Sequence, residues 1–146
     1  MKCSIIITNY NYGKFAERCI RSCLKQHFDQ SQFEVIFVDD RSTDDSEKIV
    51  KKFKKFKNFI FIKNKKNLGV AGCANVGILN SKSEYIVRVD ADDYISKDTL
   101  NFLSTYLDKD QSLFGVACDY YYFNEENSKK IRVSAREVPV SCGIMY

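Results

Sequence analysis

The chain has 146 residues, a length typical of one domain. Its 45% hydrophobic and 29% charged residues are ordinary for a globular protein and exclude extensive disorder. The formal net charge is +4, and much of it comes from residues 48–66, where nine lysines alternate with phenylalanines. Solvated faces of a helix and a strand explain that pattern, so we expect no nucleic-acid partner, while peripheral contact with an anionic membrane surface stays open.

The six cysteines form no CxxC pair, and His27 is the only histidine, so the sequence offers no zinc-binding spacing. We interpret the cysteines as reduced and mostly buried thiols. No signal-peptide pattern follows Met1, and no segment approaches the roughly 20 apolar residues that a membrane span needs. We therefore expect a cytoplasmic protein, located at the inner face of the membrane if it contacts lipid.

Short apolar runs alternate with helical patterns along the first 110 residues. We expect a first helix that ends near residue 26 and a second that begins within residues 42–46. A third is expected from about residue 70 to 79 and a fourth over residues 97–107. Strands are expected at residues 4–8, 33–38, 59–62 and 84–89. The resulting β-α-β-α-β-α-β-α order predicts an α/β fold with a mostly parallel sheet flanked by helices.

The pattern changes after Asp110. We expect a long strand over residues 112–123, a polar turn over 124–130 and a returning strand over 131–138, just before Pro139. We therefore divide the chain into residues 1–110, an α/β domain, and residues 111–146, a β-rich region.

Three predicted strands end in polar residues, at residues 8–11, 39–42 and 90–93. In open α/β sheets, ligands bind beyond the carboxyl ends of the strands, where such loops converge. Asp90, Asp92 and Asp93 lie so close in sequence that they repel one another unless a cation or a proton neutralises them. The pattern favours a ligand site that contains a hard metal ion.

These residues resemble the family 2 glycosyltransferases, enzymes of the GT-A (Rossmann-like) fold that use nucleotide-diphosphate sugars. The similarity covers residues 3 to about 110. It is carried by residues 4–11, by the run Val38-Asp39-Asp40-Arg41-Ser42-Thr43-Asp44, by Asn67, Leu68, Gly69, Ala71, Asn75 and Gly77, and by the DxD motif Asp90-Ala91-Asp92 followed by Asp93.

The resemblance implies transfer of a sugar, most plausibly from a UDP-sugar, to a glycan or lipid-linked acceptor in polysaccharide synthesis, with inversion. It implies that Tyr10 stacks on the base, that Asp40 accepts a hydrogen bond from the base, and that Asp39 holds the loop or reaches the ribose. It places Asp90 and Asp92 at a Mn²⁺ or Mg²⁺ ion that bridges the diphosphate, with Arg88 or Lys66 as nearby cations. The implied nucleotide-sugar site consists of Thr8, Asn9, Tyr10, Asp39, Asp40, Asn75, Asp90, Ala91 and Asp92.

Two departures from the family pattern affect these expectations. The triplet Cys73-Ala74-Asn75 lacks the arginine that many members place before the asparagine. The chain also reaches Tyr146 at what resembles the start of the acceptor half, so we expect a C-terminally truncated GT-A fold whose general base lies beyond Tyr146. The acids Asp119, Glu125, Glu126 and Glu137 carry no family motif. The catalytic residues therefore stay unknown.

Other functions compete with that interpretation. A non-catalytic nucleotide-sugar-binding fragment, or one half of a longer synthase, has the same motifs. A receiver-like phosphotransfer domain needs an acid pair after the first strand, where this chain has Thr8-Asn9. An EF-hand loop starting at Asp90 would need glutamate at position twelve, where Asn101 stands, and no GxGxxG motif supports a dinucleotide-binding fold.

The tyrosine-rich run at residues 120–123 is expected to form an exposed apolar patch. Such patches favour self-association or binding of a partner. The sequence therefore predicts a homo-oligomer, observable as a concentration-dependent dimer.

Overall fold

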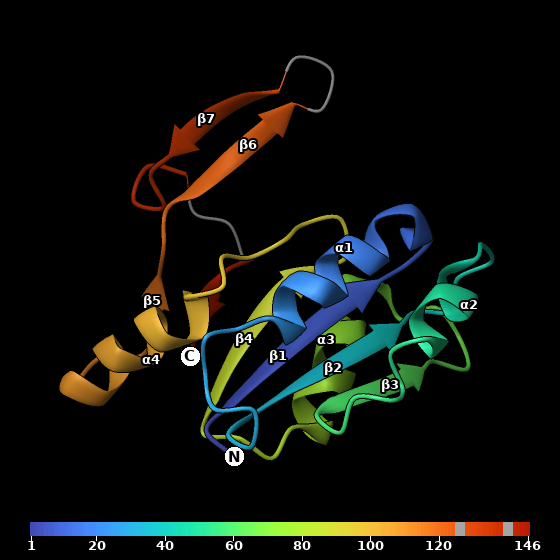
Figure 1. The fold of residues 1–146 in the computed structure, drawn as a ribbon, viewed down its shortest axis with the longest axis horizontal. Coiled ribbons are helices and arrows are strands. Elements are labelled where there is room, and N and C mark those ends of the chain that lie inside the picture. The colour runs from blue at the N-terminus through green and yellow to red at the C-terminus, as the bar shows by residue number, and fades with distance from the viewer. Residues whose placement is uncertain (125–127, 139–141) are drawn as a thin grey trace.

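The computed structural model describes residues 1–124, 128–138 and 142–146. Figure 1 shows a central sheet with the strand order β3-β2-β1-β4-β8-β5. Its strands are β1 (Cys3–Asn9), β2 (Phe33–Asp39), β3 (Phe59–Lys63), β4 (Tyr85–Asp90), β5 (Val116–Ala117) and β8 (Ile144–Met145). The first four are mutually parallel, and β8 pairs antiparallel with both β4 and β5.

Four helices cover the sheet, namely α1 (Gly13–Leu24), α2 (Ser46–Lys51), α3 (Gly69–Asn80) and α4 (Thr99–Lys109). In Figure 1, α1 and α2 lie in front of the sheet and α3 lies behind it. Ile5 and Ile7 of β1 join the larger core with α1 and α4, whereas Ile36 of β2 packs with Cys73 of α3. The α/β architecture predicted from the sequence is confirmed.

All seven residues of β1 and all seven of β2 are buried. A strand covered by helices on both faces has no solvent side, so its sequence shows no alternation of apolar and polar residues. This explains why the runs at residues 4–8 and 33–38 indicated central strands. Their carboxyl ends consequently lie at one edge of the sheet, where Thr8 pairs with Val38 on one side and with Asp90 on the other.

Gly77 permits the close packing of α3 on β1. A Cβ atom at this position would lie 2.4 Å from Cγ2 of Ile6, which is 1% exposed. We therefore expect Gly77→Ala to lower the free energy of unfolding by about 1–3 kcal/mol, because the side chain of Ile6 cannot move away in a packed core. Urea denaturation measures this loss.

Asn75→Ala on the same helix is the matched control. Asn75 is exposed, and its side chain makes no hydrogen bond with the described residues. We expect its replacement to leave stability unchanged or slightly raised, because alanine is the better helix former. Equal stability of the Gly77 and Asn75 variants would contradict tight packing at Gly77.

The prediction of one long strand over residues 112–123 was wrong. This segment divides into β5 and β6 (Tyr120–Asn124), and β6 pairs with β7 (Lys129–Val133) in a separate hairpin. Asp119, between the two strands, accepts hydrogen bonds from the guanidinium of Arg132 and from the backbone N–H of Ala135. These contacts anchor the base of the hairpin where the chain leaves the sheet.

The returning strand predicted over residues 131–138 ends at Val133. The backbone N–H groups of Glu137 and Val138 both donate to the carbonyl of Ser134, so a turn replaces the second half of the predicted strand. Pro139 lies outside the described residues, as do residues 125–127 of the turn predicted over 124–130, which include Glu125 and Glu126.

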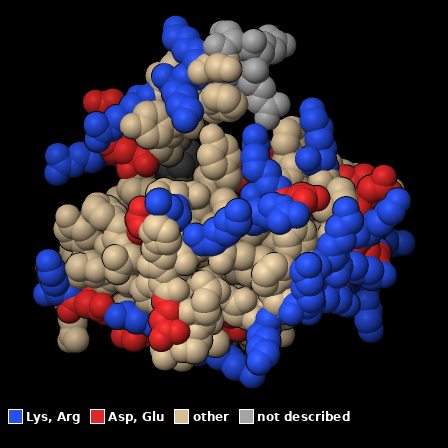
Figure 2. Space-filling view, viewed as in Figure 1, with Lys and Arg blue, Asp and Glu red and all other residues tan. Residues whose placement is uncertain are grey.

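Charge is unevenly distributed over the surface. No acidic residue occurs between Glu47 and Glu84, a stretch that contains ten lysines. Figure 2 shows many of the blue side chains gathered at the right, over the part of the molecule where Figure 1 places α2 and β3. Lys51 and Lys63 pair with Glu47, so some of this charge is neutralised locally. No helix within the described ranges is long and apolar enough to cross a membrane.

Candidate functional site

A cavity of about 480 Å³ opens where β1, β2 and β4 end and α3 begins. Its walls come from four segments that are distant in sequence. The lining residues are Thr8, Asn9, Tyr10, Tyr12, Asp40, Asn67, Gly69, Val70, Cys73, Arg88, Asp90, Ala91 and Asp92. The predicted convergence of the three strand ends on one site is therefore present in the fold.

Asp90, at the end of β4, is held by one residue of the neighbouring strand β1 and by one residue of β4 itself. Thr8 Oγ1 donates to Asp90 Oδ1 over 2.9 Å. Arg88 Nη2 lies 2.7 Å from both oxygens of the same carboxylate. Residues two apart on a strand point to the same face, which explains why Arg88 and Asp90 both enter the cavity while Val87 and Val89 join the core.

Asp39 does not line the cavity. It is fully buried, and its carboxylate accepts hydrogen bonds from Asn9 Nδ2 at 2.8 Å and from Ser42 Oγ at 2.5 Å. Asn9 also donates to Ser46 at the start of α2. Asp39 therefore joins the loops after β1 and β2, in agreement with the first of the two roles expected for it.

Asp40 lines the cavity and also caps α3. One of its oxygens accepts from Asn64 Nδ2 at 2.8 Å, and the other accepts from the backbone N–H of Gly69 at 2.8 Å. The N–H of Leu68 lies within 3.0 Å of both oxygens. The carboxylate thus satisfies amides that would otherwise lack partners at the helix N-terminus, while it is only 3% exposed.

Asp92 is exposed, and none of the described residues donates a hydrogen bond to its carboxylate. Its backbone carbonyl accepts from Arg18 Nη2 at 3.2 Å, and Arg18 also lies over the ring of Tyr94. Burial raises the pKa of the neighbouring Asp93, and the charges of Asp92 and Asp90 raise it further. Three carboxyl groups thus lie in one short loop, and the carboxylate of Asp92 is the one to which no described residue donates a hydrogen bond.

The arrangement suits a divalent cation shared with a ligand rather than a closed metal centre. Within residues 1–124, 128–138 and 142–146, no group of three or more His, Cys, Asp or Glu side chains could hold a metal ion alone. Asp90 and Asp92 are both in the cavity wall, however, and Mg²⁺-type sites combine one or two carboxylates with phosphate oxygens and water. The residues therefore fit a hard cation that binds together with a phosphate-bearing ligand.

Tyr10 and Tyr12 form the exposed aromatic part of the wall, with 47% and 45% of their surfaces exposed. Asn75 is not brought to the cavity. It lies on the outer side of α3, and the buried Cys73 lines the cavity instead. Apart from Arg88, the cavity wall contains five residues outside the site predicted from the sequence, namely Tyr12, Asn67, Gly69, Val70 and Cys73. The spacing of Cys73 and Gly77 on one helical face could have identified the inner side of α3.

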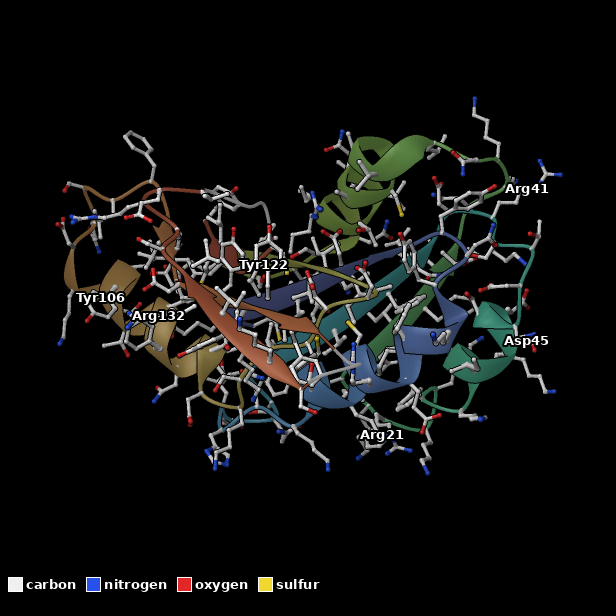
Figure 3. All side chains as sticks on the ribbon, turned by 90° about the horizontal axis from the view of Figure 1, so that it is seen from above. Arg21, Arg41, Asp45, Tyr106, Tyr122 and Arg132 are labelled. Atoms are coloured by element: carbon white, nitrogen blue, oxygen red, sulfur yellow. The ribbon has the colours of Figure 1, made fainter. Side chains whose placement is uncertain are left out.

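A wider hollow lies on the other side of the acidic loop. It is lined by Phe15 and Arg18 of α1, by Asp90 and residues 92–96, and by the aromatic residues of β6. Figure 3 shows Tyr122 and Arg132 on the hairpin, well separated from Arg41 in the loop after β2. Tyr121 and Tyr122 are 61% and 58% exposed, so the apolar patch expected at residues 120–123 is present.

Comparisons with known proteins agree with this geometry. The sequence profile described as "Glycosyl transferase family 2" matches residues 4–140. Poly(ribitol-phosphate) β-N-acetylglucosaminyltransferase TarS of Staphylococcus aureus is 36% identical over 113 residues, which are 77% of this chain and 20% of TarS. Glycosyltransferase GlyG of Streptococcus pneumoniae is 34% identical over 85% of this chain and 40% of its own length. The chain thus spans well under half of these relatives.

Solved structures show the same fold. Residues 1–349 of TarS in complex with UDP-GlcNAc superpose with a TM-score of 0.70 at 35% identity, over 75% of this chain and 32% of that one. A mannosyltransferase of Pyrobaculum calidifontis, solved with GDP-Man and Mn²⁺, gives a TM-score of 0.75 at 23% identity, over 80% of this chain and 35% of that one. Because the family profile matches residues 4–140 of its 146 residues, this chain belongs to the family 2 glycosyltransferases, and it has their GT-A-like fold.

Proposed function

We propose that this chain is the donor-binding part of a metal-dependent glycosyltransferase that transfers a sugar from a UDP-sugar to a hydroxyl group of a polymer. The observation that carries the proposal is the single cavity that joins Tyr10, Asp40, Asp90 and Asp92. TarS, solved with UDP-GlcNAc, supports the choice of a UDP-sugar. Its name, which specifies a poly(ribitol-phosphate) acceptor, supports a polymer as the second substrate.

The cavity offers a distinct group for each part of such a donor. Tyr10 presents an aromatic face for the base, and Asp40 lies beside it as an acceptor. Thr8 and Asp90, joined by a hydrogen bond at the ends of β1 and β4, would face the ribose and the diphosphate that follow the base. Asp92 and Asp90 would hold Mn²⁺ or Mg²⁺, which neutralises the charge that develops on the departing diphosphate.

Asp119, one of the acids expected in the acceptor half, is poorly suited to act as the general base. Arg132 and the N–H of Ala135 hold the pKa of Asp119 below its usual range, and both of its oxygens are engaged. A carboxylate in that state is a weak proton acceptor. A non-catalytic donor-binding part of a longer synthase therefore stays the alternative, and the inverting outcome stays part of the proposal.

Peripheral membrane contact also stays a proposal. The lysine-rich side over α2 and β3 attracts anions, anionic lipid head groups included. Phe56 and Ile60 are the exposed apolar residues of this region, at 39% and 37%. These modest exposures favour a surface contact over insertion.

Calorimetric titration tests the proposal directly. UDP and GDP are titrated into the purified chain in the presence of Mn²⁺ and again in EDTA. We expect UDP to bind more tightly than GDP and more tightly with Mn²⁺ than without it. A folded chain that binds neither nucleotide would refute donor binding by this region.

The role of Tyr10 gives a second measurable outcome. We expect Tyr10→Ala to weaken UDP binding by about 1–3 kcal/mol, or roughly 5- to 150-fold, because a stacked base loses its aromatic platform. Tyr10→Phe keeps the ring and serves as the control. A loss confined to Tyr12→Ala would instead assign the stacking to Tyr12, which lines the same wall.

A further inference from the structure

Among the described residues that line the cavity, Arg88 is the only basic one, against the three acids Asp40, Asp90 and Asp92. A nucleoside diphosphate would bring more negative charge into the same space. Like charges at such short range strongly disfavour binding unless cations lie among them. A divalent ion supplies two positive charges, and the guanidinium of Arg88 is the remaining source within the wall.

The contacts of Arg88 leave most of its hydrogen-bonding capacity unused. Its Nη2 atom is engaged by both oxygens of Asp90. Its Nε atom is buried and has no acceptor among the described residues, and none of them accepts from Nη1. A guanidinium carries five N–H donors in a rigid fork that matches phosphate oxygens. Three donors are thus oriented by the ion pair with Asp90 and lack an acceptor within the described chain.

The position of Arg88 is fixed by the fold. It lies opposite Ile6 in the pairing of β4 with β1, two residues before Asp90 and on the same face of the strand. Its side chain is 21% exposed. A partly buried arginine retains its charge and makes stronger charge-assisted bonds than an exposed one. The side chain therefore has the charge, free donors and location that a phosphate ligand needs.

We propose that Arg88 binds the diphosphate of the donor directly, with Asp90 as the residue that orients its guanidinium. This inference rests on the proposed function and extends it, because it assigns the phosphate contact to a residue outside the DxD motif. Arg88 then contributes to binding without metal as well as with it, whereas Asp92 acts only through the metal.

The test compares uridine, UMP and UDP on the wild-type chain and on Arg88→Gln and Arg88→Lys, by calorimetry in EDTA and in Mn²⁺. We expect Arg88→Gln to weaken UDP binding about 10- to 100-fold in both conditions and to leave uridine binding unchanged. Arg88→Lys restores part of the loss, since it retains the charge but not the fork. Lys57→Gln, which removes an exposed lysine far along the chain from the cavity, is the charge-matched control and leaves UDP binding unchanged.

A merely structural role would produce a different result. If Arg88 only masks the charge of Asp90, the double variant Arg88→Gln/Asp90→Asn should bind UDP in EDTA as tightly as the single variant Asp90→Asn does. That result would overturn the proposal. If Arg88 binds phosphate, the double variant stays weaker than Asp90→Asn. If Arg88→Gln loses as much affinity for uridine as for UDP, the proposal is also overturned, because an equal loss indicates that the pocket is disturbed. Wild-type chain that fails to bind UDP would instead refute the proposed function itself.

Discussion

Replacing Asp92 with alanine should remove the part of the UDP affinity that Mn²⁺ confers, a loss of at least about 100-fold in the presence of the metal. Changes that only disturb the orientation of a metal ligand typically cost about 10- to 100-fold, so removal of a ligand should cost no less. The carboxylate of Asp92 is exposed and accepts no hydrogen bond from the described residues, so the fold does not depend on it. Calorimetry with Mn²⁺ and with EDTA measures the effect.

Two comparisons make the Asp92 result interpretable. In EDTA the variant and the wild-type chain should bind UDP equally, because the substitution acts only through the metal. Asp45→Ala, which removes an exposed acid at the start of α2, should leave both measurements unchanged. An Asp92→Ala chain in which Mn²⁺ still strengthens UDP binding would place the cation elsewhere.

Replacing Asp40 with alanine should lower the free energy of unfolding by about 3–5 kcal/mol. The substitution leaves the buried Asn64 Nδ2 and the partly buried N–H of Leu68 without their acceptor, and it leaves the N–H of Gly69 with Asn67 Oδ1 alone. Each unsatisfied buried donor costs about 1–3 kcal/mol, partly relieved where water enters. The cavity wall formed by the start of α3 should loosen with it, so UDP binding should fall as well. Chemical denaturation and calorimetry measure the two effects.

Asp40→Asn separates the two roles of this residue. Its amide oxygen still accepts one hydrogen bond, so we expect a smaller loss of stability than in Asp40→Ala. Unchanged stability in Asp40→Ala, with UDP binding lost, would show that Asp40 serves only the ligand and does not hold α3.

The sequence predicts the positions of those candidate site residues that lie at the ends of strands, because chain geometry alone decides where they are. Thr8, Asp40 and Asp90 lie at or just after the ends of three parallel strands, and parallel strands that are neighbours in a sheet present their carboxyl ends together. Apolar runs without alternation are enough to identify such strands. No tertiary contact had to be known to infer that these residues meet.

Residues whose position depends on packing were harder to predict. Asn75 belongs to a motif, yet it lies on the outer side of α3 because Cys73 and Gly77 occupy the inner side. Arg88 was only one of two candidate cations, since the sequence does not say that its guanidinium meets Asp90. Residues 112–123 were predicted as one strand because they favour strands, but the contacts of Asp119 that accompany its division involve Arg132 and Ala135, which lie beyond the hairpin turn.

All the described residues that line the cavity fall between Thr8 and Asp92, whereas the hairpin that borders the neighbouring hollow comes later in the chain. One continuous stretch of coding sequence therefore specifies this part of the cavity wall. If the cavity binds the nucleotide of a sugar donor as proposed, recombination or insertion downstream of that stretch could change the acceptor without altering how the nucleotide is recognised. Such a separation would give enzymes of this kind a simple evolutionary route to new products.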